Sequence, residues 1–207
     1  MATPTIRCGE AFSIDFHPSR QLLATALITG QIKVYDCAGA RPLRFGTARP
    51  HKGACRTVRF TPGGESIFSG GSDRSLQQRD VIANEAVWKQ RCAHKSAING
   101  LIPVGEHGVA GGDDDGRVQV WDVRQQASVL QFEEHADFLS DLLYREHDHS
   151  LACTSGDGYL SVLDLRRGRL EARARCRCVR APRESRFMRS RRRAATTRRT
   201  SCSASRR

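Results

Sequence analysis

The sequence predicts an all-β fold made of four repeated units, followed by a basic tail. The first observation is a recurring aspartate: Asp36, Asp80, Asp122 and Asp164 lie 44, 42 and 42 residues apart. The second is that short apolar runs alternate with turn residues before residue 167, without helical periodicity. The third is the charge: residues 167–207 carry 16 arginines and 2 glutamates, whereas residues 1–166 carry 18 basic and 20 acidic side chains. A near-neutral repeat region therefore precedes a strongly basic tail.

Each unit is expected to supply four short strands. In the third unit we expect strands over residues 97–104, 108–112, 117–123 and 128–132, separated by turn residues. The alternation of Val118, Gln119 and Val120 is typical of a half-buried strand. The repeat region is residues 1–171, with units at about 8–44, 51–92, 94–134 and 135–171. The low hydrophobicity and high charge of residues 172–207 predict a disordered arginine-rich tail.

A histidine opens each of the last three units, and an aspartate follows at a nearly fixed distance. The pairs are His51 and Asp73, 22 residues apart, His94 and Asp115, 21 apart, and His135 and Asp157, 22 apart. A period of about 40–45 residues with strand-like content is typical of WD40 propeller blades. The chain therefore resembles the WD40 repeat superfamily, which implies a β-propeller with four blades present.

The WD40 resemblance implies a buried hydrogen-bond network of His, Asp, Ser or Thr, and Trp in each blade. The residues expected in it are His51, Asp73, His94, Asp115, Trp121, His135, Ser155 and Asp157. No unit is complete, because Asp113 stands where serine is expected in the third and Leu163 replaces tryptophan in the fourth. The same residue types also suggest a hydrolase, but catalysis needs an exposed nucleophile beside an oxyanion hole. We therefore expect a structural network and no enzymatic activity.

Longer stretches resemble the family of WD repeat-containing protein 55. They read HKGACRTVRF, AHKSAINGL followed by GGDDDGRVQVWDVR, and LACTSGDGYLSVLDLRRGRLE. The resemblance covers roughly residues 10–171. It implies a scaffold in the nucleus and nucleolus, with the cytoplasm as a further compartment, that supports ribosomal RNA processing and binds pre-ribosomal factors.

Members of that family form a seven-bladed propeller, whereas four units are present here. An arc of four blades leaves sheet edges open, which a propeller avoids by closing the ring. We expect a truncated or frame-shifted gene product, because the sequence changes abruptly to arginine-only basic character after Glu171. Closure of four blades on their own is the alternative.

A W-D-x-R motif, formed by Trp121, Asp122 and Arg124, indicates an alternative function. It resembles the docking box of substrate receptors of cullin-4 ubiquitin ligases, in which the arginine contacts the damaged-DNA-binding adaptor. A guanidinium just past a strand can form a bidentate pair with an acidic partner. Most WD40 repeats with arginine at this position are ordinary blades, so both interpretations stay open.

The tail offers a second alternative, non-specific RNA binding. The candidate patch for nuclear import or RNA comprises Arg189, Arg191, Arg192, Arg193, Arg198 and Arg199. Arginines that neutralise phosphates release counterions, so such binding would be sensitive to salt and blind to sequence. A solvated tail without a function is the competing interpretation.

Several other classes of protein do not fit this sequence. No apolar run approaches the ~20 residues of a membrane helix, and the N-terminal residues lack the apolar core of a signal peptide. The eight cysteines are irregularly spaced, without the paired Cys/His spacing of structural zinc. The aspartates at 113–115 lack the alternating oxygen ligands of a calcium loop. We expect no cofactor, metal, membrane or small-molecule substrate, and protein partners instead.

Overall fold

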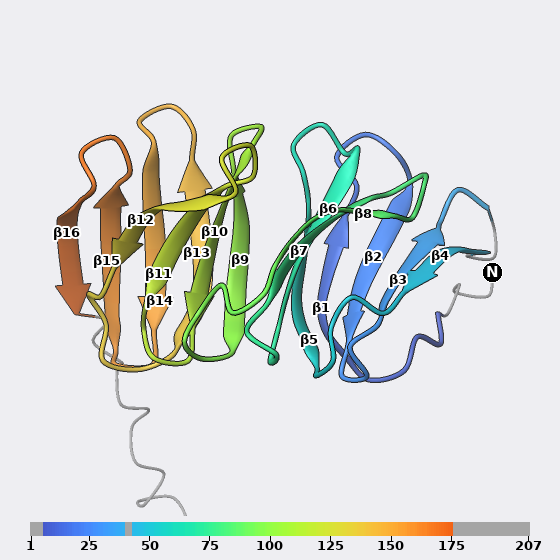
Figure 1. Cartoon of the computed structure of the whole chain (residues 1–207), viewed down its shortest axis with the longest axis horizontal. Coiled ribbons are helices and arrows are strands. Elements are labelled where there is room, and N and C mark those ends of the chain that lie inside the picture. Colours follow the sequence, from blue (N-terminus) through green and yellow to red (C-terminus); the bar gives the residue numbers. More distant parts are fainter. Residues whose placement is uncertain (1–5, 40–42, 176–207) are drawn as a thin grey trace, which may run out of the picture. The chain divides into compact units, whose positions relative to one another are not determined.

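The computed structural model describes residues 6–39 and 43–175. Over this range the chain forms sixteen strands and no helix, which confirms the all-β prediction. The strands make four antiparallel sheets of four, and the strands in each sheet follow chain order (Figure 1). We call these sheets blades 1 to 4. Within the described ranges, no helix is long and apolar enough to cross a membrane.

The strands of the first two blades are five or six residues long. Blade 1 consists of β1 (Ala11–Phe16), β2 (Leu22–Leu27), β3 (Ile32–Asp36) and β4 (Leu43–Ala48). Blade 2 consists of β5 (Cys55–Phe60), β6 (Ser66–Gly71), β7 (Leu76–Asp80) and β8 (Ala86–Gln90).

The last two blades repeat this pattern with slightly longer strands. Blade 3 consists of β9 (Ile98–Val104), β10 (Gly108–Asp113), β11 (Val118–Asp122) and β12 (Ala127–Phe132). Blade 4 consists of β13 (Leu139–Arg145), β14 (Ser150–Ser155), β15 (Tyr159–Asp164) and β16 (Arg169–Arg175). The strands of blade 3 match the four predicted segments to within one residue at each end.

The blades share irregularities as well as strands. In every blade the register shifts once between the first and second strands. It shifts again between the third and fourth strands, next to the residue that precedes the recurring aspartate. In blade 3 this second bulge lies between Val120 and Trp121. Bulges at equivalent places show that the repeats share backbone geometry as well as sequence pattern.

Successive blades pack face to face through three hydrophobic clusters. One cluster joins blades 1 and 2, a second joins blades 2 and 3, and a third joins blades 3 and 4. Val120 and Trp121 alternate along β11, so Val120 packs toward blade 4 and Trp121 toward blade 2. Because blade 2 is covered on both faces, β6 is buried at all six positions, including its serines and glycines.

The last strand extends past the expected end of the fourth unit at residue 171. β16 pairs with β15 up to Tyr159 and Arg175. The guanidinium of Arg173 lies 4.2 Å from the centre of the Tyr159 ring and 3.4 Å from the Asp157 carboxylate. These contacts keep the first arginines of the basic segment in the sheet. The six candidate arginines between 189 and 199 lie outside the described residues.

Candidate functional site

Blade 2 contains the most connected of the expected histidine networks. The His51 ring Nδ1 lies 2.9 Å from Asp73 Oδ1 and 3.0 Å from Ser75 Oγ, and Nε2 lies 3.0 Å from Ser69 Oγ. The Asp73 carboxylate also accepts the Lys52 and Ser75 backbone N–H groups. His51 is thus bonded through both ring nitrogens, and Asp73 ties the blade entry to the β6–β7 turn.

The electrostatics of His51 and Asp73 are those of a structural network in which each charged or polar atom has a partner. Burial lowers the pKa of His51, although Asp73 acts in the opposite direction. Burial alone would raise the pKa of Asp73, but hydrogen bonds from Lys52, Ser75 and His51 hold it below its ordinary value. A neutral His51 therefore donates from Nδ1 to the Asp73 carboxylate, and Nε2 accepts the hydroxyl proton of Ser69.

Blade 3 uses a different carboxylate, so the expected pairing of His94 with Asp115 is wrong. His94 Nδ1 lies 3.1 Å from Oδ2 of Asp113, which is fully buried at the end of β10. Asp113 Oδ1 accepts the backbone N–H groups of Asp115 and Arg117 at 3.1 and 2.9 Å. The Asp115 side chain is exposed in the turn. Asp113 occupies the strand position that Gly71 has in blade 2, so blade 3 has a carboxylate where blade 2 has no side chain.

The rest of the blade 3 network is incomplete. His94 Nε2 and Trp121 Nε1 are both buried, and neither has a hydrogen-bond partner among the described residues. Gly111 pairs with Gln119 at the position where Ser69 pairs with Gln77 in blade 2. A Cβ on Gly111 would lie only 2.7 Å from His94 Nε2, so the ring fills the space that a serine side chain would need.

Blade 4 completes its network from another strand. His135 Nδ1 lies 3.1 Å from Asp157 Oδ2, and Nε2 lies 2.7 Å from Ser161 Oγ on β15. The expected Ser155 does not contact His135: its hydroxyl donates to the Asp137 carbonyl at 2.9 Å. Cys153 occupies the position of Ser69, and burial raises the pKa of its thiol to about 12. A residue on the third strand therefore replaces the one on the second.

These networks offer no catalytic geometry. Ser69 and Ser161, the hydroxyl groups bonded to histidine Nε2, are both buried, so a substrate cannot reach them. Among residues 6–39 and 43–175, no cluster of three or more His, Cys, Asp or Glu side chains is arranged to hold a metal ion. What the arrangement does is fix the turns between strands.

The recurring aspartates have a second structural role, at the turn between the third and fourth strands. In each blade the carboxylate accepts the backbone N–H two residues later, at 2.8 to 2.9 Å; the pairs are Asp36 with Ala38, Asp80 with Ile82, Asp122 with Arg124, and Asp164 with Arg166. Such turns are characteristic of aspartate.

This turn determines what the candidate docking motif can present. Trp121 is buried between blades, and the Asp122 carboxylate is engaged by the Arg124 and Gln125 N–H groups. Arg124 is exposed, and its guanidinium forms no hydrogen bond or ion pair with the described residues. Of the three residues, Arg124 is therefore the one available to a partner.

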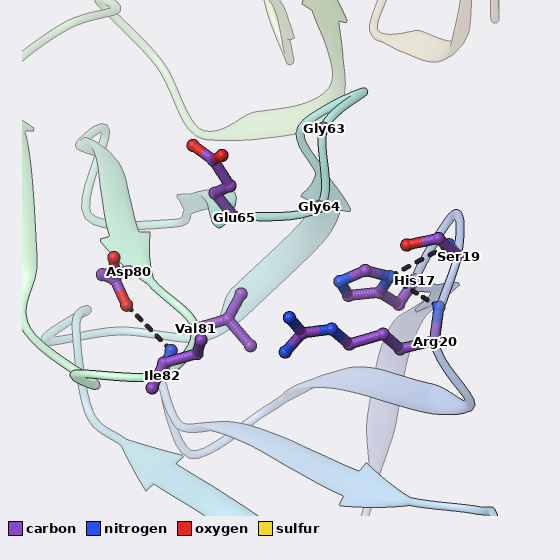
Figure 2. A pocket seen from close by; sticks show the side chains of 9 residues that line it. All are labelled: His17, Ser19, Arg20, Gly63, Gly64, Glu65, Asp80, Val81 and Ile82. Carbon is purple, nitrogen blue, oxygen red and sulfur yellow. Dashed lines mark hydrogen bonds between the residues drawn. The ribbon is translucent and has the colours of Figure 1, made fainter.

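Two hollows lie at the same end of the blades. The first, of about 410 Å³, lies between turns of blades 1 and 2, where Arg20, Glu65 and Asp80 surround it (Figure 2). His17 Nδ1 accepts the Ser19 and Arg20 N–H groups at 3.1 and 3.0 Å, which fixes the β1–β2 turn. The same ring lies against Gly64 of blade 2. A Cβ on Gly64, whose φ is +77°, would lie 2.3 Å from the His17 ring.

The second hollow, of about 480 Å³, shares Gly63 and Glu65 with the first and extends to blade 3. Its far wall contains His107, whose carbonyl accepts the N–H of Val123, next to Arg124. We call this end of the blades the charged rim; it comprises Arg20, Glu65, Asp80, Glu106, His107 and Arg124. Sequence reasoning missed the hollows, because their walls come from turns about 40 residues apart. The only local signal was the Thr61-Pro62-Gly63-Gly64 turn.

Comparison with known proteins agrees with this architecture. The family "WD domain, G-beta repeat" matches residues 44–80 and 87–122. The chain is 39% identical to WD repeat-containing protein 55 of Arabidopsis thaliana over 80% of this chain and 47% of that protein. It is 36% identical to a homolog of that protein in Dictyostelium discoideum, over 74% of this chain and 37% of the relative. It is 33% identical to WD repeat-containing protein JIP5 of Cryptococcus neoformans, over 76% of this chain and 45% of that protein.

The chain thus spans less than half the length of these relatives, and the similarity covers 74 to 80% of the chain. The two family matches run from β4 through β7 and from β8 through β11, and all four blades share their strand order, bulges and turn aspartates. The chain belongs to the WD40 repeat superfamily, as a relative of WD repeat-containing protein 55.

Proposed function

We propose that this chain is a non-enzymatic scaffold that supports ribosomal RNA processing in the nucleolus by holding pre-ribosomal factors. One observation carries the proposal: the chain is 39% identical to WD repeat-containing protein 55 of Arabidopsis thaliana over 167 residues, which is 80% of its length. WD40 repeats mediate protein–protein interaction, and the buried networks of blades 2 and 4 leave no reactive group exposed. The nucleolar role rests on the family resemblance.

The charged rim is the surface we assign to partner binding. Arg20, Glu65 and Glu106 are exposed around two adjoining hollows. Side chains of a partner that enter such hollows lose their water and contribute most to affinity. The mixture of acidic and basic groups favours a partner with charges of both signs, which gives specificity through complementary placement.

The basic C-terminal segment supports a location among nucleic acids. Residues 167–207 carry 16 arginines and 2 glutamates. We expect retention of the chain on RNA to fall steeply as salt rises, because each neutralised phosphate releases counterions. Removal of the tail, residues 172–207, should abolish that retention, and removal of residues 189–207 alone should reduce nuclear accumulation. Sequence-selective RNA binding that persists in high salt would contradict this electrostatic account.

Localisation and depletion in cells test the scaffold function together. The tagged chain should colocalise with a nucleolar marker, and its depletion should cause precursor ribosomal RNA to accumulate. The parent chain should restore processing, whereas the double variant Glu65→Lys and Glu106→Lys should not. Lys95→Glu, an exposed charge between β8 and β9 at the opposite end of the blades, serves as the control. Normal precursor levels after depletion would refute the function.

A second candidate function is substrate reception for a cullin-4 ubiquitin ligase. The observation that favours it is the exposed guanidinium of Arg124, which the Asp122 turn presents and which has no partner within residues 6–39 and 43–175. Loss of an interface arginine commonly costs about 2 kcal/mol or more. Arg124→Ala should therefore weaken binding of the damaged-DNA-binding adaptor by about 30-fold or more.

The matched control is Arg166→Ala, because Arg166 occupies the same turn position in blade 4. Arg124→Lys should restore little binding, since an ammonium group cannot reproduce the planar fork. Neither alanine variant should change thermal unfolding, because both side chains are exposed. Equal adaptor binding by the parent and Arg124→Ala, or no binding by the parent, would eliminate the ligase function.

A further inference from the structure

Blade 4 exposes the face that blades 2 and 3 bury against their next neighbour. Phe68 of blade 2 and Ala110 of blade 3 are buried there, whereas Ala152 at the equivalent position of blade 4 is half-exposed. Leu143, which pairs with Ala152 on this face, is 67% exposed. Its counterpart Ile102 packs against the cluster between blades 3 and 4. We call this surface of blade 4 the forward face.

Blade 1 exposes the opposite face, which the later blades bury against the blade before them. Ile14 pairs with Thr25 as Val58 pairs with Ser69 and Leu101 with Gly111, so the three apolar residues are equivalent. Val58 and Leu101 are buried, whereas Ile14 is 57% exposed. Phe12 and Phe16 on the same strand are also exposed. We call this surface of blade 1 the backward face.

The two faces are the complementary halves of a junction that the chain forms three times. Within the chain, the forward face of each blade meets the backward face of the next. The turn that accompanies the forward face is already formed in blade 4: Gly158 has a φ of +81°, like +80° at Gly116. A Cβ on Gly116 would lie 2.5 Å from the His135 carbonyl of the next blade, whereas one on Gly158 would meet nothing within 4 Å.

From this complementarity we infer that the two faces bind a second copy of the chain. The forward face of each copy covers the backward face of the other, so both apolar surfaces are buried by contacts of a kind already present within one chain. A head-to-tail contact of this kind forms a closed ring when the rotation that relates successive copies brings the last copy back onto the first. Two sets of four blades make eight, which lies within the range of about 4–8 blades found in propellers.

Size-exclusion chromatography with light scattering tests the assembly on the 207-residue chain. The parent should elute with twice the chain mass of 23.0 kDa. Ile14→Glu disables the backward face and Leu143→Glu disables the forward face, so each variant alone should have the mass of one chain. Both side chains are mostly exposed, so circular dichroism should show parent-like folding. Val129→Glu, an exposed position on β12, should leave the parent mass unchanged.

Mixing the two glutamate variants distinguishes the head-to-tail contact from other associations. The Ile14→Glu copy retains a forward face and the Leu143→Glu copy retains a backward face, so an equimolar mixture should form a two-chain complex through one junction. The inference is overturned by a monomeric parent at micromolar concentration, by loss of association in only one variant, or by a mixture that stays monomeric. A parent that forms larger open polymers also overturns it.

Discussion

Blades 2 and 3 fix the same turn with an equivalent histidine, but they surround that histidine differently. In blade 2, His51 contacts Asp73, Ser75 and Ser69 through its two ring nitrogens. In blade 3, His94 contacts only Asp113, and its Nε2 lacks a partner among the described residues. Two strand positions differ: blade 2 has Ser69 and Gly71 where blade 3 has Gly111 and Asp113.

This difference teaches that the carboxylate of the network need not come from a fixed position. Asp113 lies two residues before the expected Asp115, yet it both contacts His94 and accepts two backbone N–H groups of the turn. Burial alone would raise the pKa of Asp113, but the hydrogen bond from His94 and those from the Arg117 and Asp115 backbone hold it below its ordinary value. The carboxylate that closes the turn is therefore ionised in both blades. The histidine Nε2 has a hydroxyl partner in blade 2, whereas in blade 3 it has none among the described residues.

The largest expected effect concerns Trp121, whose packing in blade 3 has no counterpart in blade 2, where Arg79 stands. Trp121→Ala should destabilise the chain by about 3–5 kcal/mol, because it empties part of the core between blades 2 and 3. Chemical denaturation measures this. Trp121→Phe should cost much less, about 1 kcal/mol, because the indole N–H that it removes has no partner in the described part of the chain. Equal losses for the two variants would show that the N–H is engaged.

The second effect compares the histidines directly. His51→Ala and His94→Ala remove the same ring from equivalent sites, so the loss of packing is similar in both. Asp73 and Asp113 each keep two backbone donors, so the difference lies in Ser69: His51→Ala should cost about 1 kcal/mol more, because it also leaves the buried Ser69 hydroxyl without its ring partner. Denaturation midpoints of the two variants provide the test. A larger loss for His94→Ala would reverse the comparison.

The comparison also shows how far sequence reasoning reached. The spacing of aspartates and histidines predicted the four blades, and the pairings of His51 with Asp73 and of His135 with Asp157 occur in the structure. The choice between Asp113 and Asp115 depends on which carboxylate reaches the His94 ring, which the repeat spacing does not encode. Ser161 was missed because it reaches His135 from the third strand instead of the second.

The candidate binding surface was harder to predict than the network. Arg124 was recognised because its motif is contiguous, and the structure places it at the exposed turn. The hollows between blades depend on turns from different repeats, such as His17 against Gly64. Contacts between distant segments arise from the packing of blades, so local sequence patterns do not reveal them.

The third effect is a pH dependence that blade 2 contributes through His51. Its pKa is lowered by burial, so on acidification the unfolded chain takes up a proton near the ordinary histidine value of about 6.5 before the folded chain does. Stability should therefore fall from about pH 7 toward about pH 5, by at most about 1.4 kcal/mol per pH unit for this group. The lowered pKa of Asp73 contributes only below its ordinary value of about 3.9, outside this window.

Denaturation midpoints across that pH range should show a shallower slope for His51→Ala than for the parent. His147→Ala is the control, because His147 is exposed in the turn between β13 and β14. If the His51→Ala slope equals that of the parent, then the ring takes up a proton as readily in the folded chain as in the unfolded chain, and burial does not lower its pKa as assigned here.

The smallest effect comes from exchanging the residues at one of the positions that differ, Ser69 in blade 2 and Gly111 in blade 3. Ser69→Ala should cost about 1 kcal/mol, because His51 Nε2 loses its hydroxyl partner.

The reciprocal change in blade 3 has two components. Any side chain at Gly111 places its Cβ against the His94 ring, so Gly111→Ala and Gly111→Ser both require that ring to move. Only the serine supplies a hydroxyl group to the buried His94 Nε2 and Trp121 Nε1 atoms. Gly111→Ser should therefore be more stable than Gly111→Ala by about 1 kcal/mol, measured as the difference between their denaturation midpoints. Because the steric cost is shared, this difference reports the hydrogen bond alone, and equal stability of the two variants would mean that the serine missing from blade 3 is not what leaves its network incomplete.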